Sequence, residues 1–126
     1  VEMRSPDGSA DLYQLLAGLA VACRHGFEIE NALAIAEQTY VNVNIHQKEN
    51  ADKLKALAQL PNSCAASADC LQKQRTVFEQ YNVFSPAMID GIISRLRSYN
   101  DATLRKDIQD KPEEMLALVS KFFHCG

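Results

Sequence analysis

The feature that most constrains this chain is a run between Leu12 and Cys23 that is apolar on almost every side. Its larger apolar side chains recur at helical spacing, at Leu12, Leu15, Leu16, Leu19 and Cys23. The positions between them are also apolar or small, apart from Gln14. A helix of this kind is normally buried all round. Since the other helices of a 126-residue chain can cover only one or two of its sides, we expect part of its packing partner to be missing.

The bounds of this first helix follow from its flanking residues. Ser9 is a favoured N-cap, with Asp11 in the first turn, and the pair His25-Gly26 predicts the helix end near Arg24. A second helix is expected from Glu28, because apolar residues continue at spacings of three and four. The stretch 39–45 also alternates like a half-buried strand, so the end of this second element stays open between helix and strand.

The rest of the chain predicts further helices and no domain boundary, so residues 1–126 form a single domain. A short solvated helix is expected over 48–58. Ser63 caps a helix that continues to about Tyr81. Ser85-Pro86 gives the clearest helix start, a cap followed by proline at the first helical position.

A last helix is expected from Pro112 to Gly126. Its apolar residues are expected to face inward, and they are Met115, Val119, Phe122 and Phe123.

Composition excludes several classes of function. The chain is 47% apolar and 23% charged, as in an ordinary globular domain, and its formal net charge is -3. Lysine and arginine are scattered, so we expect neither nucleic acid nor an anionic membrane as a partner. With no apolar run long enough to span a bilayer and no signal-peptide pattern, a cytoplasmic location is expected.

The four cysteines are expected to be free thiols rather than bridges or zinc ligands. Three of Cys23, Cys64, Cys70 and Cys125 lie in or beside amphipathic patterns, where cysteine acts as a small hydrophobe. No histidine stands at ligand spacing from them, so a structural zinc site is not expected.

The first four residues contain the one pair of side chains that could take part in catalysis or binding. In an extended Val1-Glu2-Met3-Arg4, Glu2 and Arg4 would lie on one face of a strand, roughly 6 to 7 Å apart. From these four residues alone, an ordinary exposed ion pair on an edge strand is the better interpretation. The chain also opens without an initiator methionine, which suggests that it is cut from something longer.

A longer pattern changes that interpretation. The segment 1–13, VEMRSPDGSADLY, resembles the Glu-x-Arg-x-Pro-Asp-x-x-x-Asn-Pro-Tyr-Leu motif of the glutamine synthetase family. Two weaker matches follow in the family's order, a Leu-Pro-x-Ser element at 60–63 and a Val-Phe-Ser-Pro-x-x-Ile-Asp element at 83–90. Asp11 stands where the family usually has asparagine, Leu12 replaces its proline, and 28–58 matches poorly.

The resemblance implies a fold and an activity. The chain would be the mainly α, C-terminal part of a glutamine synthetase-type catalytic domain, with a short N-terminal strand remnant. Such enzymes use ATP to convert glutamate to a γ-glutamyl phosphate, which ammonia attacks, with Mg²⁺ or Mn²⁺ in the active site. By this resemblance Glu2 is a metal ligand, and Arg4 is a catalytic residue that binds substrate. The full-length protein would be a homo-oligomer, and this chain alone would be inactive.

Two alternatives remain open at this stage. One keeps the chemistry and changes the nucleophile, giving a γ-glutamyl ligase that uses another amine. The other is an autonomous helical interaction module, in which the opening strand is incidental and the first helix binds a partner.

Overall fold

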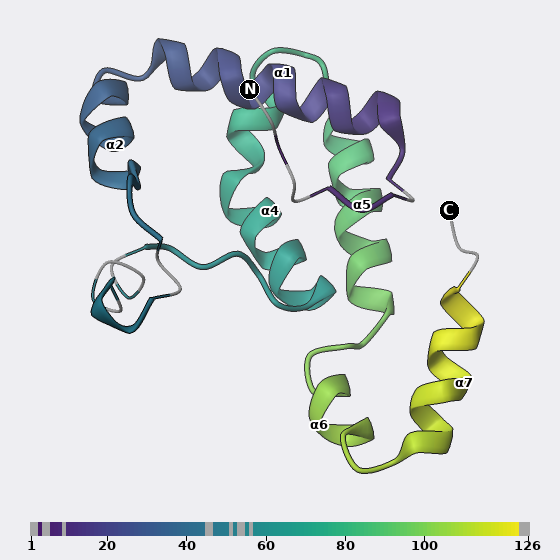
Figure 1. Cartoon of the computed structure of the whole chain (residues 1–126). Coiled ribbons are helices and arrows are strands. Elements are labelled where there is room, and N and C mark those ends of the chain that lie inside the picture. The colour runs from purple at the N-terminus through teal and green to yellow at the C-terminus, as the bar shows by residue number, and fades with distance from the viewer. Residues whose placement is uncertain are drawn as a thin grey trace.

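The computed structural model describes residues 3, 6–8, 10–44, 47–50, 52, 55 and 57–123. Within these ranges the chain is mainly α and has no strand, so the predicted fold class is confirmed. The elements are α1 (Leu12–Glu28), α2 (Ala32–Thr39), the 3-10 turn η1 (Lys48–Asn50), α4 (Cys64–Glu79), α5 (Pro86–Ser98), α6 (Leu104–Ile108) and α7 (Pro112–Phe122) (Figure 1). The expected strand remnant falls mostly on residues outside the described ranges.

Helices α4 and α5 form the centre of the molecule, and both begin where the sequence predicts. The Ser63 hydroxyl accepts a hydrogen bond from the Ala66 amide at 3.0 Å. The Ser85 hydroxyl accepts from the Met88 amide at 3.2 Å, and proline follows it at the first helical position. α4 ends at Glu79, slightly before the predicted Tyr81, because the turn that follows contains Asn82 in the left-handed region with φ 56°.

The core lies where α1 crosses one end of the antiparallel α4–α5 pair, beside the turn that joins them (Figure 1). The buried apolar side chains of the described residues are Val21, Ala68, Phe84, Ile89 and Ile93. Phe78 packs edge-to-face on Phe84, with ring centroids 5.8 Å apart. This small cluster holds three helices together and leaves the others at its margin.

Helix α1 is longer at its C-terminal end than predicted. The expected end at His25-Gly26 is wrong, because the helix continues through Gly26 to Glu28. Its last turn carries an ion pair between Arg24 and Glu28, and Glu28 also accepts a hydrogen bond from Tyr81 beyond α4, so a contact outside the helix supports this turn. The helix expected from Glu28 therefore begins later, at Ala32.

The start of α1 also differs from the prediction. The predicted cap, Ser9, lies outside the described residues, and the observed N-cap is Asp11. Its carboxylate accepts hydrogen bonds from the Tyr13 and Gln14 amides at 2.9 and 3.0 Å. Aspartate is as good an N-cap as serine, so the predicted type of N-cap residue is right. Its predicted position is two residues too early.

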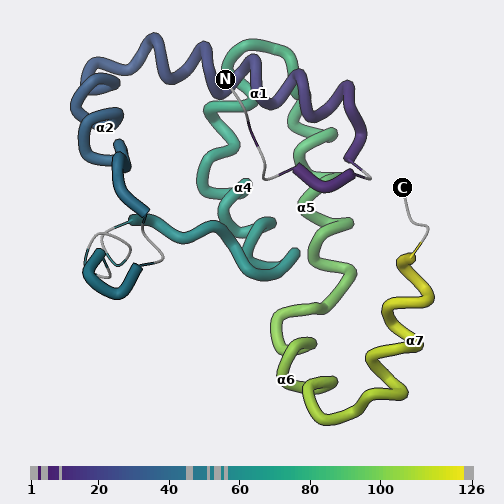
Figure 2. Tube along the Cα trace, viewed as in Figure 1, coloured from purple at the N-terminus to yellow at the C-terminus, as the bar shows by residue number. Residues whose placement is uncertain are grey.

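The connection between α2 and α4 is mostly irregular. α2 ends at Thr39, and residues 40–44 form neither the helix nor the strand that their pattern allows. Of the helix expected over 48–58, η1 and residues 52 and 55 are helical, residues 57 and 58 are not, and 51, 53, 54 and 56 lie outside the described ranges. In Figure 2 the part of this connection that directly follows α2 lies to one side of the α4–α5 pair.

At the C-terminal end the start of α7 agrees with the prediction, whereas its inward face does not and α6 was not predicted. α7 begins at Pro112 as predicted and ends at Phe122, whereas the predicted end, Gly126, lies outside the described residues. Its apolar residues are not inward-facing, since Met115, Val119, Phe122 and Phe123 are 40 to 73% exposed. α7 packs against α6, and one ring contact joins Phe122 to Tyr99. The five-residue α6 was not predicted, because so short a helix has no readable periodicity.

The chain presents far more surface than a compact protein of its size. Its accessible surface is 10664 Å², whereas a compact monomer of 14.0 kDa exposes about 6,700 Å². Large apolar side chains on α1, α2 and α7 are among the exposed residues. No helix in the described part of the chain is both long and apolar enough to cross a membrane.

Candidate active site

The two site residues expected from the sequence, Glu2 and Arg4, lie outside the described residues. The structure therefore places neither of them, and their roles stay predictions. What it does describe is Met3 and the segment through which this motif enters α1, namely 6–8 and 10–11.

That entry segment is a turn followed by a firmly capped helix. The Ala10 amide donates to the Asp7 carbonyl at 3.1 Å, which reverses the chain just before α1. Asp11 then caps α1 through the Tyr13 and Gln14 amides. The family's asparagine and the aspartate found here are equally good N-caps, so this departure preserves the helix start. The motif is thus followed directly by a hydrogen-bonded turn and a capped helix start.

A charged cluster on the other end of α1 is structural. Arg24 pairs with Glu28 at 2.8 Å and stacks over the Tyr81 ring, 4.2 Å from its centroid. The Tyr81 hydroxyl donates to the other Glu28 oxygen. The hydrogen bond from Arg24, then that from Tyr81, holds the pKa of Glu28 below its usual range, and donation to Glu28 raises the pKa of Tyr81. The cluster ties α1 to the turn after α4.

Two further ion-pair groups join α4 to α5. Arg75 bonds Glu79 at 2.7 Å within α4 and reaches Asp90 of α5 at 3.0 Å. Arg97 of α5 pairs with Asp69 of α4 at 2.8 Å while remaining half exposed. The two cross-helix pairs, Arg75–Asp90 and Arg97–Asp69, therefore support the packing of α4 against α5.

The Asp101 carboxylate caps α4, a helix far from it in sequence. Its oxygens accept hydrogen bonds from the Cys64 and Ala65 amides at 2.6 and 3.1 Å. These bonds, the Cys64 amide first, hold the pKa of Asp101 below its usual range. Burial raises the pKa of the Cys64 thiol, and the adjacent Asp101 carboxylate adds to the effect. Asp101 therefore locks the chain after α5 onto the start of α4.

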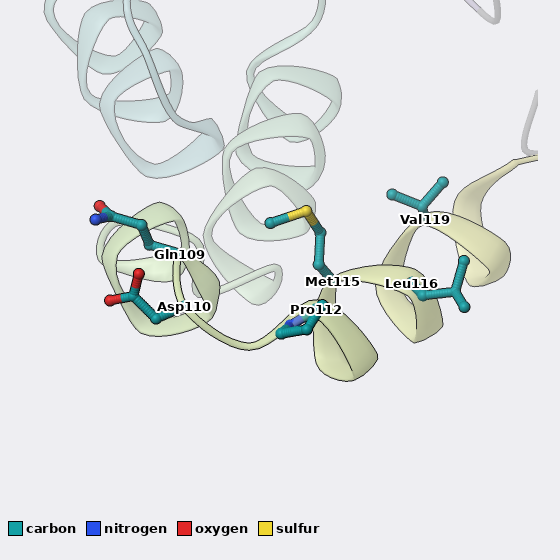
Figure 3. A pocket seen from close by; sticks show the side chains of 6 residues that line it. All are labelled: Gln109, Asp110, Pro112, Met115, Leu116 and Val119. Carbon is teal, nitrogen blue, oxygen red and sulfur yellow. The ribbon is translucent and has the colours of Figure 1, made fainter.

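An open hollow lies between α6 and α7 (Figure 3). Its lining is mainly apolar, and Gln109 and Asp110 are its polar members. In Figure 3 Met115 projects from the start of α7, while Leu116 and Val119 lie further along that helix. With one exposed carboxylate and no second titratable group, this hollow has no means for acid–base or phosphoryl-transfer chemistry.

The described residues also contain no group of three or more His, Cys, Asp and Glu side chains that could hold a metal ion. Cys23, Cys64 and Cys70 are free thiols, while Cys125 lies outside the described ranges. His25, suggested by the sequence to be a C-cap residue, lies inside α1, where its carbonyl accepts from the Ile29 amide. Glu2 would supply a single carboxylate, and a hard divalent cation takes about six oxygen ligands. If Glu2 is a ligand, the others would come from elsewhere.

Comparison with known proteins gives one match. A model of the glutamine synthetase catalytic domain matches residues 1–115, which include the opening motif and all elements up to the start of α7. The comparison with curated proteins finds no match. The comparison with solved structures finds none either.

Proposed function

Because the chain belongs to the glutamine synthetase catalytic-domain family, we propose that it is the helical C-terminal part of an ATP-dependent glutamate–ammonia ligase. The family is one of ligase enzymes that generally use ATP and divalent metal ions. The observation that carries the proposal is the match over residues 1–115, since it begins on the Glu-x-Arg motif itself. It favours the ligase over an autonomous helical module.

In this proposal Glu2 supplies one carboxylate to a divalent cation near the transferring phosphate. Carboxylate oxygen is the ligand that Mg²⁺ and Mn²⁺ prefer, and such an ion neutralises charge on phosphate oxygens when bound. Arg4 presents a planar guanidinium that can bond two oxygens of a carboxylate or phosphoryl group at once. Phosphoryl transfer depends mainly on positioning and charge neutralisation, which these two side chains are suited to provide.

The described helices serve this site as a scaffold. The Asp7–Ala10 turn and the Asp11 cap fix where the motif meets α1, and Val21 anchors α1 in the core. A site residue held by such a support keeps its geometry during the reaction. The nucleotide site, the remaining metal ligands and the amine site would lie on other parts of the intact enzyme.

The test is ATP- and glutamate-dependent phosphate release by the intact protein with ammonium as the acceptor. We expect turnover with the intact protein and none with residues 1–126 alone, because one carboxylate cannot hold the ion against water. Phosphate release by residues 1–126 alone would contradict the proposal that the nucleotide site and the other metal ligands lie outside this chain. Absence of any γ-glutamyl transfer by the intact protein would contradict the ligase itself.

The acceptor amine is settled by the same assay. Ammonium, methylamine and a polyamine are supplied in turn at equal concentration, and the γ-glutamyl product is identified by mass. Glutamine as the main product supports a glutamate–ammonia ligase. A γ-glutamyl alkylamide or polyamine conjugate would assign the enzyme to the related class that uses another amine.

A further inference from the structure

Helices α6 and α7 form a unit that stands apart from the core. Their backbones contact each other, and within the described part of the chain neither comes into contact distance of α1, α2, α4 or α5. Neither helix has a fully buried residue. In Figure 1 α6 follows below α5, and α7 then turns back upward. We call these two helices the α6–α7 unit.

The unit borders an open hollow near the start of α4. Asn62, from the segment before α4, lines this hollow together with Leu104 and Ile108 of α6 and Met115 of α7. Helices hold each other in place through side chains that fill the space between them. Because this space is open, packing contributes little to the position of the unit.

Hydrogen bonds from the start of α4 hold the unit instead. Asp101 lies just before α6, and its carboxylate accepts from the Cys64 and Ala65 amides at 2.6 and 3.1 Å. A charged acceptor at a helix N-terminus is both strong and directional. The ring contact between Tyr99 and Phe122, with centroids 6.3 Å apart, is weaker support because the two residues are 45 and 42% exposed. We call the two bonds of Asp101 the Asp101 latch.

The chain has a pivot directly before the latch. Residues 99–103, between α5 and α6, are not helical. Asn100 lies in the left-handed region with φ 48°, and its amide donates to the Arg97 carbonyl at 3.1 Å, which ends α5. Hinges in proteins are short segments of this kind at the ends of elements, where a change in φ and ψ turns everything that follows. Rotation here would move α6 and α7 together.

We propose that the α6–α7 unit is hinged at residues 99–103, and that the Asp101 latch holds it in the position that the structure shows. Releasing the latch lets the unit rotate without unfolding, because neither the contact between α6 and α7 nor the packing of α4 on α5 depends on the Asp101 side chain. The movement changes the width of the hollow beside Asn62. The inference does not depend on ligase activity.

The test measures the distance from α4 to α7 by double electron–electron resonance. Spin labels are placed on Cys70 of α4, which is exposed, and on Leu116→Cys of α7, where the leucine is 68% exposed. The background carries Cys23→Ser, Cys64→Ser and Cys125→Ser. We expect one narrow distance distribution with the latch intact, and a distribution at least about twofold broader in Asp101→Ala.

Ser63→Ala is the matched control. It removes the hydrogen bond to the third amide of α4, at the same helix end, and leaves both bonds of Asp101 in place. Its distribution should therefore stay as narrow as that of the parent. A second label pair, on Cys70 and on Ala87→Cys of α5, measures the α4–α5 pair and should be unchanged in every variant. Far-UV circular dichroism checks that the helices are kept.

Four results would overturn the proposal. The first is an α4–α7 distribution that stays narrow in Asp101→Ala, and the second is equal broadening in Ser63→Ala. The third is equal broadening of the α4–α5 pair in Asp101→Ala, which would indicate general loosening of the fold. The fourth is a loss of helical signal in Asp101→Ala, which would show that the unit unfolds rather than rotates.

Discussion

The link between Asp101 and the start of α4 can be tested by removing the carboxylate. Asp101 accepts hydrogen bonds from the first two amides of α4 at 2.6 and 3.1 Å, and Ser63 accepts from the third. In Asp101→Ala two amides at a helix N-terminus lose their partner and the favourable charge there disappears. Loss of a side-chain cap with its charge at this end costs about 2 kcal/mol of unfolding free energy.

The assay is urea unfolding followed by far-UV circular dichroism at fixed protein concentration. With an m-value of about 2 kcal/mol/M, the unfolding midpoint should fall by about 1 M urea. Asp110→Ala is the matched control, since Asp110 is exposed and should change stability by less than about 0.5 kcal/mol. Hydrogen exchange of the Cys64 and Ala65 amides should accelerate in Asp101→Ala more than that of amides in α7.

The pH dependence supplies an independent check of the same contact. Because the pKa of Asp101 is lowered in the folded chain, its contribution is complete above the usual aspartate pKa and is lost as pH falls through the lower folded value. The stability difference between wild type and Asp101→Ala should therefore be constant near neutrality and shrink in acid. Equal midpoints for wild type and Asp101→Ala at neutral pH, or a difference that grows in acid, would refute the reasoning.

Three further predictions follow from other contacts. Ile89→Ala should lower the unfolding free energy by about 2 to 5 kcal/mol in the same urea assay, because Ile89 is buried in the core; a cost below about 1 kcal/mol would contradict that placement. Tyr81→Phe should remove a component of the tyrosinate absorbance titration that lies above the ordinary tyrosine range, since donation to Glu28 raises the pKa of Tyr81 and the bond is lost as pH rises through that value. A lost component that lies within the ordinary tyrosine range would disprove the bond. In the intact enzyme Arg4→Lys should cut turnover by at least about 10-fold, because lysine keeps the charge and loses the planar fork; full activity would exclude a two-point contact.

The sequence predicted those parts of the fold that depend on local signals. Ser63 and Ser85-Pro86 marked the starts of α4 and α5, because a capping hydroxyl acts on amides two or three residues away. The end of α1 was missed because it depends on Tyr81, which lies 53 residues from Glu28. No local pattern contains such a contact.

The inward face predicted for α7 failed for a different reason. Periodicity shows that Met115, Val119 and Phe122 share a side of the helix, but it does not show whether another element covers that side. The same reasoning succeeded for α1, where an apolar surface on every side led to the expectation that some of it is left uncovered. Leu12 and Leu16 are exposed as expected, whereas Val21 is the one large residue of the run that is fully buried.

The candidate site was reached from the sequence by resemblance rather than by physical pattern. Glu2 and Arg4 as an isolated pair are no more informative than any exposed ion pair. The motif around them, and its order relative to residues 60–63 and 83–90, supplied the family, which the match over residues 1–115 confirms. Their chemical roles stay predictions.

The most direct test of the central proposal is the metal dependence of turnover in the intact enzyme after Glu2→Ala, with Met3→Ala as the control at the neighbouring position. If Glu2 is a metal ligand, Glu2→Ala should lower turnover by at least about 100-fold at saturating Mg²⁺ and weaken Mn²⁺ binding measured by calorimetry, while the free energy of unfolding stays within about 0.5 kcal/mol of wild type. Met3→Ala should retain most of the activity. Wild-type turnover and unchanged Mn²⁺ affinity in Glu2→Ala would contradict the proposal that this chain supplies a ligand to the active site.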